Sequence, residues 1–436
     1  MEPGDEIVAR YDERGDVVGQ VARSVMRREN LWHAASSVVV RDPLGRIYLH
    51  RRTTTKDVYP GLLDFAAGGV VLAGEDPQLG AVREAEEELG VHGVRLEPRG
   101  VVAYEDAHTR YHAHRFTVEW DGPIRWQPEE VSWGDWVGVD DLVQRLDDDP
   151  GAIVPDSAAV WAAVLRGWQA DRVMLTQGWD SEASLVEGRW VDRSARRPEV
   201  ERQLLSEAAL LPLLGDALAA TGVELPRPQV VRREPLTLRH PIVVGVPADP
   251  AQLTTADGDR LGRFLSALHG TDASVVAVTG VPTAADDVVD RADQLERFRA
   301  DVLPLLAATG GDRVGAARLL DTVAVIAEQA LCHADLLPEH VLVREGGLAG
   351  IIDWGDTRVT DPAVDLAWAL HGTNRGFAEA VRTAYGTRAD VEERARAWWA
   401  LAPWFDVHRD VFLGDATALV SDLATLTERL QWWQAS

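Results

Sequence analysis

Two short stretches of this 436-residue chain carry carboxylates at spacings that suit metal-dependent chemistry on phosphate groups. In the first stretch, Glu84, Glu87 and Glu88 follow a glycine-containing loop and fall on a predicted helix. Residues three and four apart share one face of a helix, so the three carboxylates project from one patch and repel one another. Mg²⁺ relieves such repulsion and keeps coordination positions for substrate phosphates and water. The first stretch therefore predicts a magnesium site.

The second stretch is LCHADLLPEHVLVREGGLAGIIDW, which contains Asp335, His340 and Asp353. Phosphoryl transfer from a nucleotide needs one carboxylate that accepts the hydroxyl proton and two groups that hold Mg²⁺. Here a loop residue is followed five residues later by a second polar group, and then by a strand, a turn, a strand and an aspartate. This spacing brings the three side chains together and predicts a phosphotransferase site.

The elements that must position the first site are those of a mixed α/β domain. From about residue 32 to 136, short β-branched or alternating runs are separated by Gly, Pro and Asp, which is typical of strands and turns. An amphipathic helix is predicted over 77–89, and a second one follows Pro155. We place the end of this domain near residue 172.

The remaining residues, 173–436, predict a second domain with few strands and many helices. Strand-like runs occur up to HPIVVGV, with a helix from about 198 to 214 between them. Helices dominate afterwards, except that HVLVREGGLAGIIDW consists of two apolar runs joined by Glu-Gly-Gly and predicts a β-hairpin. The whole chain is therefore expected to be an α/β protein of two domains.

The first domain resembles a Nudix hydrolase. The segment GGVVLAGEDPQLGAVREAEEELGV fills every specified position of the Nudix box, G-x5-E-x7-R-E-U-x-E-E-x-G-U. The flanking HRRTTTKDVYPGLLDFAAGG resembles the isopentenyl-diphosphate-isomerase-like branch, whose isomerases use a cysteine just before the box. The chain has one cysteine, Cys332, far from the box, so hydrolysis of a diphosphate is favoured over isomerisation. The resemblance implies an α/β/α sandwich over 1–172, Mg²⁺ held by Glu84, Glu87 and Glu88, and Glu130 as a further ligand or base.

The second domain resembles the aminoglycoside phosphotransferase family, whose motifs are H-G-D-x4-N, I-D-W and D-P-A-x-D-L-A. The chain has HADLLPEH, IIDW and DPAVDLA. His340 replaces the usual Asn, as in macrolide 2'-phosphotransferases, and a neutral imidazole can ligate a divalent ion. Ala334 replaces Gly, which is a small change if its φ is negative. The resemblance implies a bilobal, protein-kinase-like fold with an N-lobe over about 173–247 and a C-lobe over about 248–436.

The same resemblance implies roles for residues of the N-lobe. Arg193 takes the place of the base that contacts the donor phosphates, and Glu207 that of its ion-pair partner. Gly178 and Ser181 fall in the expected nucleotide-covering loop. The resemblance implies GTP or ATP as the phosphoryl donor, with GTP favoured, Mg²⁺ as the cofactor and a macrolide-like amino sugar as the acceptor.

Composition limits the partners. With 44 basic and 70 acidic residues, the formal net charge is −26, which disfavours nucleic acid and favours a cationic small molecule. One cysteine excludes an internal disulfide, and there is no uncharged run near 18 residues and no apolar leader. We therefore expect a cytoplasmic protein without a membrane partner. The sequence leaves the oligomeric state open.

The residues leave three alternatives to an antibiotic kinase. The kinase half could phosphorylate a metabolite or biosynthetic intermediate, with the Nudix domain acting on the related diphosphate, since a fold does not fix a substrate. The Nudix domain could be the working enzyme, with a non-catalytic kinase-like module attached. Both halves could also bind nucleotides as a scaffold without turnover.

Overall fold

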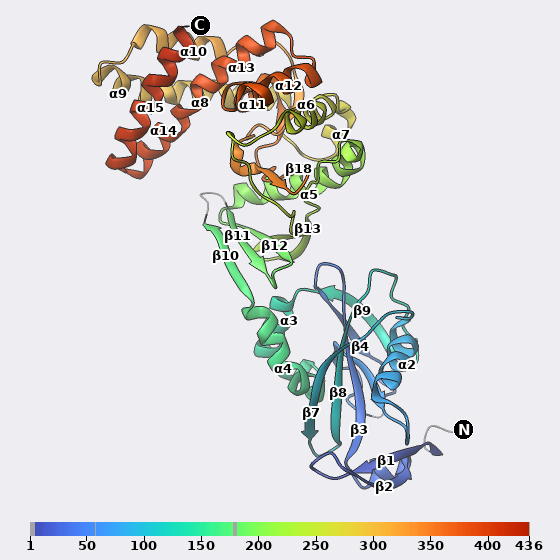
Figure 1. Cartoon of the computed structure of the whole chain (residues 1–436). Coiled ribbons are helices and arrows are strands. Elements are labelled where there is room, and N and C mark those ends of the chain that lie inside the picture. The colour runs from blue at the N-terminus through green and yellow to red at the C-terminus, as the bar shows by residue number, and fades with distance from the viewer. Residues whose placement is uncertain (1–4, 57, 178–180, 436) are drawn as a thin grey trace. The chain divides into compact units, whose positions relative to one another are not determined.

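A computed structural model describes residues 5–56, 58–177 and 181–435 (Figure 1). The chain divides into two compact units. The first unit comprises Met1–Gly178, Glu182–Ser194 and Val230–Arg239, and the second comprises Trp179–Ser181, Ala195–Gln229 and His240–Ser436. The chain crosses between the units more than once and enters the second unit for the last time at Arg239–His240, at the start of the segment HPIVVGV.

A mixed β-sheet forms the centre of the first unit (Figure 1). Its strand order is β5-β4-β3-β8-β7, with β6 also paired to β3 and β9 to β4. Strand β3 is parallel to β8 and antiparallel to β4 and β6, which confirms the predicted mixed sheet. The strands are β3 (His33–Arg41), β4 (Ile47–Arg52), β5 (Leu63–Asp64), β6 (Ala67–Val70), β7 (Glu97–Glu105), β8 (Arg110–Glu119) and β9 (Val131–Val137).

Helices cover both faces of this sheet. Successive residues of a strand point to opposite faces, so Val38 packs in one cluster with Ala85 and Val39 packs in another with Leu142 and Trp161. These clusters form the α/β/α sandwich that the sequence predicted. The covering helices are α2 (Pro77–Leu89) on one face and α3 (Val139–Asp148) and α4 (Pro155–Ala170) on the other.

Helix α2 has the predicted bounds because strong local signals set both ends. The Asp76 side chain accepts a hydrogen bond from the backbone N–H of Gln78, and Pro77 occupies the first turn. At the other end, Gly90 adopts a left-handed conformation with φ of +72°. The acidic face of α2 is thereby fixed against the loop that precedes it.

The remaining elements of the first unit are a small N-terminal motif and a second sheet. The second sheet has the order β10-β11-β12-β14-β13. A strand was predicted over HPIVVGV, but β14 ends at Pro241 because proline has no N–H for the ladder. The bounds are β1 (Ile7–Tyr11), β2 (Val17–Ala22), α1 (Arg23–Arg28), β10 (Arg172–Gln177), β11 (Ser181–Val186), β12 (Trp190–Ala195), β13 (Gln229–Arg233) and β14 (Leu236–Pro241).

The second unit is mainly helical, with two small sheets of order β15-β17-β18 and β16-β19. The hairpin predicted over HVLVREGGLAGIIDW is present as β17 and β18. Its short strands are β15 (Val246–Pro247), β16 (Ala330–Cys332), β17 (Val341–Arg344), β18 (Gly347–Ile351) and β19 (Arg358–Thr360). Its main helices are α5 (Pro198–Leu218), α6 (Thr255–His269), α8 (Ala284–Arg297), α10 (Arg313–Val323), α11 (Ala363–His371), α12 (Arg375–Tyr385), α13 (Ala389–Leu401), α14 (Pro403–Leu413) and α15 (Ala416–Gln434).

By length and composition alone, one described helical stretch, Val200–Thr221, is apolar enough to cross a membrane. This is weak evidence, because core helices of soluble proteins pass the same test. Leu210, Leu211 and Leu214 on this stretch are fully buried in the core that also contains Phe264 of α6. These leucines therefore account for part of its apolar character by packing.

Candidate functional site

Two glycines of strand β6, Gly68 and Gly69, allow this strand to lie close to β3 and to helix α2. A Cβ atom added to Gly68 would collide with the carbonyl oxygen of Ser36, and one added to Gly69 would collide with the carboxylate of Glu84. Gly69 is the first residue of the Nudix box. Its requirement for glycine therefore comes from a close approach to Glu84 and needs no unusual backbone conformation.

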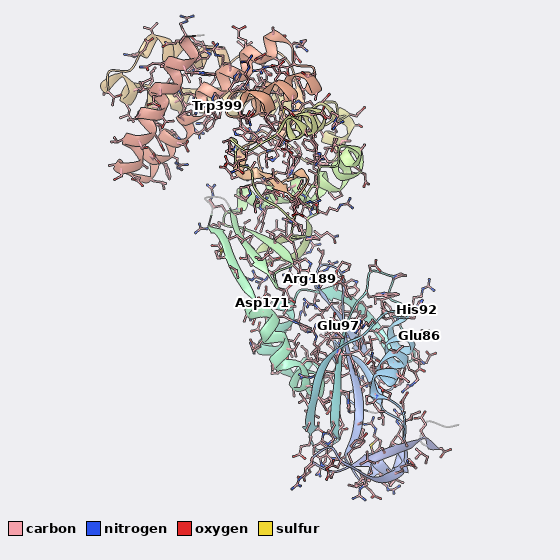
Figure 2. All side chains as sticks on the ribbon, viewed as in Figure 1. Glu86, His92, Glu97, Asp171, Arg189 and Trp399 are labelled. Carbon is pink, nitrogen blue, oxygen red and sulfur yellow. The ribbon has the colours of Figure 1, made fainter. Side chains whose placement is uncertain are left out.

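Arg83 holds the acidic residues of α2 and its preceding loop in place. Its guanidinium donates to Glu84 at 2.6 Å and lies 3.3 Å from both Glu75 and Glu87. Burial raises the pKa of Glu84, although the charge of Arg83 opposes that rise. Glu86, which is labelled in Figure 2, belongs to the same helix but is exposed, with no part in these contacts.

Next to this cluster around Arg83, the buried carboxyl of Glu88 pairs with that of the partly exposed Glu130. Glu88 is 5% exposed and accepts a hydrogen bond from the backbone N–H of Gly68 at 3.2 Å. Burial and a hydrogen bond with Glu130 raise the pKa of Glu88 well above its usual range. The structure therefore brings these two predicted residues together from separate segments, in surroundings that disfavour the charged form of Glu88.

Lys56 belongs to this site as the partner of Glu88 and Glu130, although it was not predicted as a site residue. Its ammonium lies 2.6 Å from a carboxylate oxygen of Glu130 and 3.6 Å from one of Glu88. Lys56 is the only lysine in the sequence, whose other basic residues are arginines and histidines. A single lysine in a chain with 44 basic residues was a signal in the sequence that could have pointed to Lys56.

The donor set fits a divalent cation. Glu84, Glu88 and Glu130 converge, and the ammonium of Lys56 contacts both Glu88 and Glu130. A hard cation prefers carboxylate oxygens and would add positive charge that favours the ionised form of these carboxyls. Glu87 is half exposed and contacts Arg83, so it lies at the open side of the cluster.

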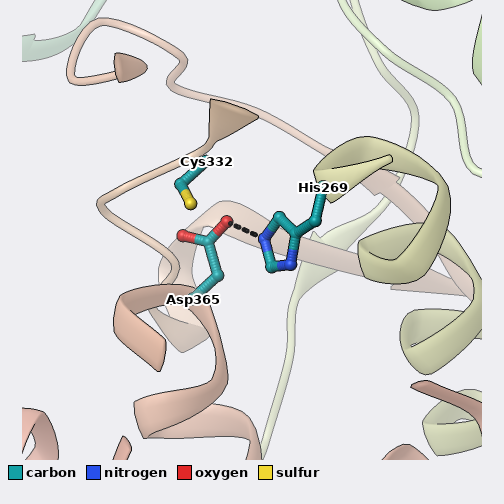
Figure 3. Close-up of side chains that lie close together, drawn as sticks. All are labelled: His269, Cys332 and Asp365. Carbon is teal, nitrogen blue, oxygen red and sulfur yellow. Dashed lines mark hydrogen bonds and ion pairs between the residues drawn. The ribbon is translucent and has the colours of Figure 1, made fainter. Parts of the chain in front are cut away.

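The loop that begins at His333 and carries Asp335 is supported by a buried hydrogen-bond network. Figure 3 shows Asp365 and His269 of this network. The carboxylate of Asp365 accepts hydrogen bonds from the backbone N–H groups of His333 and Ala334, both at 2.8 Å, and from Nε2 of His269 at 3.0 Å. Nδ1 of His269 in turn accepts from the hydroxyl of Tyr385. These contacts give Asp365 a structural role as a support of the loop.

His269, Cys332 and Asp365 place one donor atom each within 4.8 Å of one another (Figure 3). Both oxygens of Asp365 already accept hydrogen bonds, and burial raises the pKa of the Cys332 thiol, which therefore stays protonated. The thiol points to the carbonyl oxygens of Ala330 and Thr360. These contacts describe a hydrogen-bonded support for the loop rather than a metal site.

Ala334 differs from expectation. The substitution of Gly by Ala was expected to be small if φ stayed negative, but φ of Ala334 is +67°. The two backbone hydrogen bonds to Asp365, from His333 and from Ala334 itself, fix this left-handed conformation, which costs a residue with a Cβ atom about 1 kcal/mol. Asp353 also has a left-handed backbone, with φ of +63°.

The loop and hairpin bring Asp335, His340 and Asp353 together as predicted. Nδ1 of His340 lies 2.7 Å from the backbone oxygen of Asp335 and therefore carries the proton and donates it. In the neutral ring Nε2 then carries the lone pair, and it lies 3.6 Å from Oδ2 of Asp353. An imidazole nitrogen and a carboxylate oxygen side by side suit a divalent cation.

The electrostatic environment of Asp335 suits a proton acceptor. Burial and the nearby carboxylates of Asp356 and Asp353 raise the pKa of Asp335 to about 6, against the influence of His340. Asp356 was not predicted as a site residue. Its position three residues after Asp353, in IIDWGDT, was the available signal, but that spacing does not show that a turn returns Asp356 to Asp335.

A cavity of about 730 Å³ opens in front of Asp335 within the second unit. Several aromatic side chains line the cavity, among them Trp398 and Trp399 of α13. Carboxylates from α8, from α14 and from the loop after β18 also line the cavity, together with several arginines. The aromatic residues are Phe298, Trp368, Trp398, Trp399 and Phe405, and the lining carboxylates are Asp287, Asp290, Asp293, Asp356 and Asp406.

The described residues among those predicted to bind the nucleotide lie on three different elements. Arg193 is on β12, and Glu207 is on α5, where it is 3% exposed. Ser181 is the first residue of β11. Gly178 lies outside the described residues.

Comparisons with known proteins match both halves of the chain to known families. The family model described as "Phosphotransferase enzyme family" matches residues 172–401, and the model of the NUDIX domain matches residues 31–156. A Nudix hydrolase of Rhodococcus erythropolis is 41% identical over 172 residues, which are 37% of this chain and 93% of that protein. The Nudix hydrolase YfcD of Salmonella typhi is 40% identical over 159 residues, 36% of this chain and 84% of that protein.

The fold of the second half also has solved counterparts. The structure of an APH(2″)-type aminoglycoside phosphotransferase in complex with GDP and kanamycin has a TM-score of 0.51 at 20% identity. It covers 67% of this chain and 98% of its own. The chain therefore belongs to the phosphotransferase enzyme family and carries an N-terminal Nudix hydrolase domain, so that it combines a kinase-type enzyme with a hydrolase.

Proposed function

We propose that this protein transfers the γ-phosphoryl group of GTP or ATP, with Mg²⁺, to a hydroxyl group of a small molecule. The observation that carries the proposal is the convergence of Asp335, His340 and Asp353 beside a cavity of about 730 Å³. The groups present match the three that phosphoryl transfer needs, a proton acceptor and two metal ligands.

Each residue has a distinct part in the proposed reaction. Asp335 orients the acceptor hydroxyl and takes its proton as the oxygen attacks the γ-phosphorus. His340, with its Nδ1–H donated to the loop, and Asp353 would hold Mg²⁺. When bound, Mg²⁺ would neutralise charge on the nucleotide phosphates. Arg193 would contact those phosphates, with Glu207 as its partner and Ser181 and Gly178 near the nucleotide.

The acceptor that suits the cavity is a cationic molecule with a large apolar face. The aromatic rings that line the cavity attract both apolar surface and cations, and the carboxylates that line it favour an amine. A macrolide-like amino sugar has this chemistry, and the histidine at position 340 favours the same acceptor by resemblance. The same resemblance favours GTP over ATP as the donor.

The Nudix domain is proposed to hydrolyse a diphosphate. Glu84, Glu87 and Glu88 would hold Mg²⁺, and Glu130 would act as a further ligand or as the base that takes a proton from water. Lys56 keeps the Glu88 and Glu130 carboxyls together. A bound Mg²⁺ would polarise the diphosphate and lower the pKa of the attacking water.

Single substitutions in the full chain test this assignment. Asp335→Ala should abolish phosphoryl transfer to the acceptor and leave Mg²⁺-dependent diphosphate hydrolysis intact, whereas Glu87→Gln should do the reverse. Loss of both activities in either variant would contradict the assignment of one reaction to each site.

A further inference from the structure

The turn between β3 and β4, Asp42–Arg46, packs against the five-stranded sheet β10-β11-β12-β14-β13. The turn belongs to the Nudix domain, and the sheet belongs to the segment that matches the phosphotransferase family. Both nevertheless lie in the first compact unit. Segments that match two different families therefore lie within one compact unit, and the contacts between these segments show how closely they are joined.

The centre of this contact is apolar and closely packed. Leu44, Val186 and Trp190 are each at most 4% exposed and form one cluster, with Val231 packed against it. The indole N–H of Trp190 donates to the carbonyl oxygen of Pro43 at 2.9 Å. A Cβ atom added to Gly45 would collide with the ring of Trp190. The turn thus fits the sheet at the density of a protein interior.

Two buried ion pairs flank this centre. Arg41 makes two hydrogen bonds with Glu187, of 2.6 and 2.9 Å, and the two side chains are 9% and 12% exposed. Arg239 makes two hydrogen bonds with Asp192 and donates a third to the carbonyl oxygen of Leu44 at 3.0 Å. Paired arginines of this kind give a contact its specificity, because removal of one partner leaves a buried charge uncompensated.

Further contacts surround these pairs. The guanidinium carbon of Arg41 lies 4.2 Å from the ring centroid of Trp168 on α4, and that of Arg189, labelled in Figure 2, lies 4.5 Å from Trp190. Arg189 also pairs with Glu119 of β8 at 2.6 Å. The contact therefore has a desolvated centre and a polar rim, the arrangement of a specific interface.

We propose that the Nudix domain is a permanent structural part of the nucleotide-binding lobe, and that phosphoryl transfer requires this docking. The five-stranded sheet would otherwise expose Trp190 and Val186 and leave the charges of Glu187 and Arg239 with fewer partners. A sheet needs an apolar face covered to be stable. The dependence of the kinase on docking rests on the proposed phosphotransferase function, whereas the docking itself does not.

The full chain with a protease site inserted after Ala170, where α4 ends, tests the docking. After cleavage, the two pieces should elute together in gel filtration at micromolar concentration. Leu44→Asp, which places a charge in the apolar centre, and Glu187→Ala, which leaves Arg41 unpaired, should each weaken the association at least 100-fold. Arg166→Ala is the matched control, because Arg166 lies on α4 in an exposed pair with Asp147. Separation of the unsubstituted pieces would overturn the proposal.

The activity of the uncleaved chain tests whether phosphoryl transfer depends on the docking of the Nudix domain. Leu44→Asp should lower phosphoryl transfer at least tenfold while diphosphate hydrolysis stays within twofold, which shows that the Nudix domain is still folded. Arg166→Ala should change neither activity. A Leu44→Asp chain that releases the pieces on cleavage but keeps full phosphoryl transfer would overturn the dependence. If the unsubstituted chain transfers no phosphate, the proposed function fails, and co-elution alone decides the docking.

Discussion

At the scale of single residues, His340 decides how the proposed metal site works. His340→Ala should lower phosphoryl transfer by about 10²-fold or more, because it removes both the bond to the Asp335 carbonyl and the nitrogen beside Asp353. His340→Asn should keep measurable activity, because an amide can donate through nitrogen and ligate through oxygen. Steady-state kinetics at varied Mg²⁺ would measure both. A His340→Ala enzyme with unchanged activity would show that the histidine is only a loop residue.

The conformation of Ala334 gives a second residue-scale prediction. Ala334→Gly should raise the free energy of unfolding by up to about 1 kcal/mol, because glycine adopts a φ of +67° without steric cost. Ala163→Gly, at an exposed position within α4, should lower it by about 1 kcal/mol. Chemical denaturation of both variants would measure these opposite signs. Destabilisation by Ala334→Gly would show that the loop is held differently.

The residues of the two sites were predictable to different degrees. The spacing of Glu84, Glu87 and Glu88 follows from helical geometry, so local sequence was enough to group them. The partnership of Glu88 with Glu130 and Lys56 depends on where two separate loops meet helix α2, and no local pattern encodes where they meet. The left-handed φ of Ala334 was missed for a related reason, because hydrogen bonds to a distant residue, Asp365, impose it.

At the scale of elements, α2 is predicted to be a metal-binding helix. Glu88→Gln should lower Mg²⁺-dependent diphosphate hydrolysis by about 10²-fold or more without destabilising the metal-free protein, because burial already disfavours the charged form of Glu88. Mg²⁺ should raise the unfolding temperature of the unsubstituted chain more than that of the variant. Glu86→Gln, on the same helix but exposed, should leave the activity unchanged. Full hydrolysis by Glu88→Gln would refute the site.

Elements with strong end signals were predicted well, and those without them were not. Helix α2 has an aspartate cap, a first-turn proline and a terminal glycine, and the β17–β18 hairpin has Glu-Gly-Gly at its turn. The N-terminal hairpin of β1 and β2 was not predicted. Its second strand, Val17–Ala22, is mostly exposed and lacks alternation between apolar and polar residues, so the sequence carries no strand pattern there.

At the scale of the whole molecule, buried neutral histidines make stability depend on pH. Burial lowers the pKa of His33 to about 4, whereas the unfolded value is 6.5. Between these values the unfolded chain binds more protons, so His33 contributes less stability as pH falls from about 6.5 towards 4. This amounts to about 1–2 kcal/mol between pH 7 and pH 5. Asp156, whose pKa burial raises to about 6, acts in the opposite direction.

The variant His33→Asn separates these effects. Asparagine can donate to the Leu31 carbonyl as His33 does, but it does not titrate. The difference in unfolding free energy between His33→Asn and the unsubstituted chain, measured by denaturation at pH 7 and pH 5, should therefore shift in favour of the variant at pH 5. A difference that does not change with pH would contradict the burial of a neutral His33.

Phosphorylation of a panel of small molecules tests the central claim most directly. Purified full-length protein would be incubated with macrolides, aminoglycosides and nucleosides, with ATP or GTP, and with and without Mg²⁺. We expect a phosphorylated macrolide that requires Mg²⁺, with the rate lowered by about 10²- to 10⁴-fold in Asp335→Ala. A phosphorylated metabolite instead would keep the reaction and change the acceptor. Absence of any phosphorylated product, or a product formed equally well by Asp335→Ala, would contradict the account.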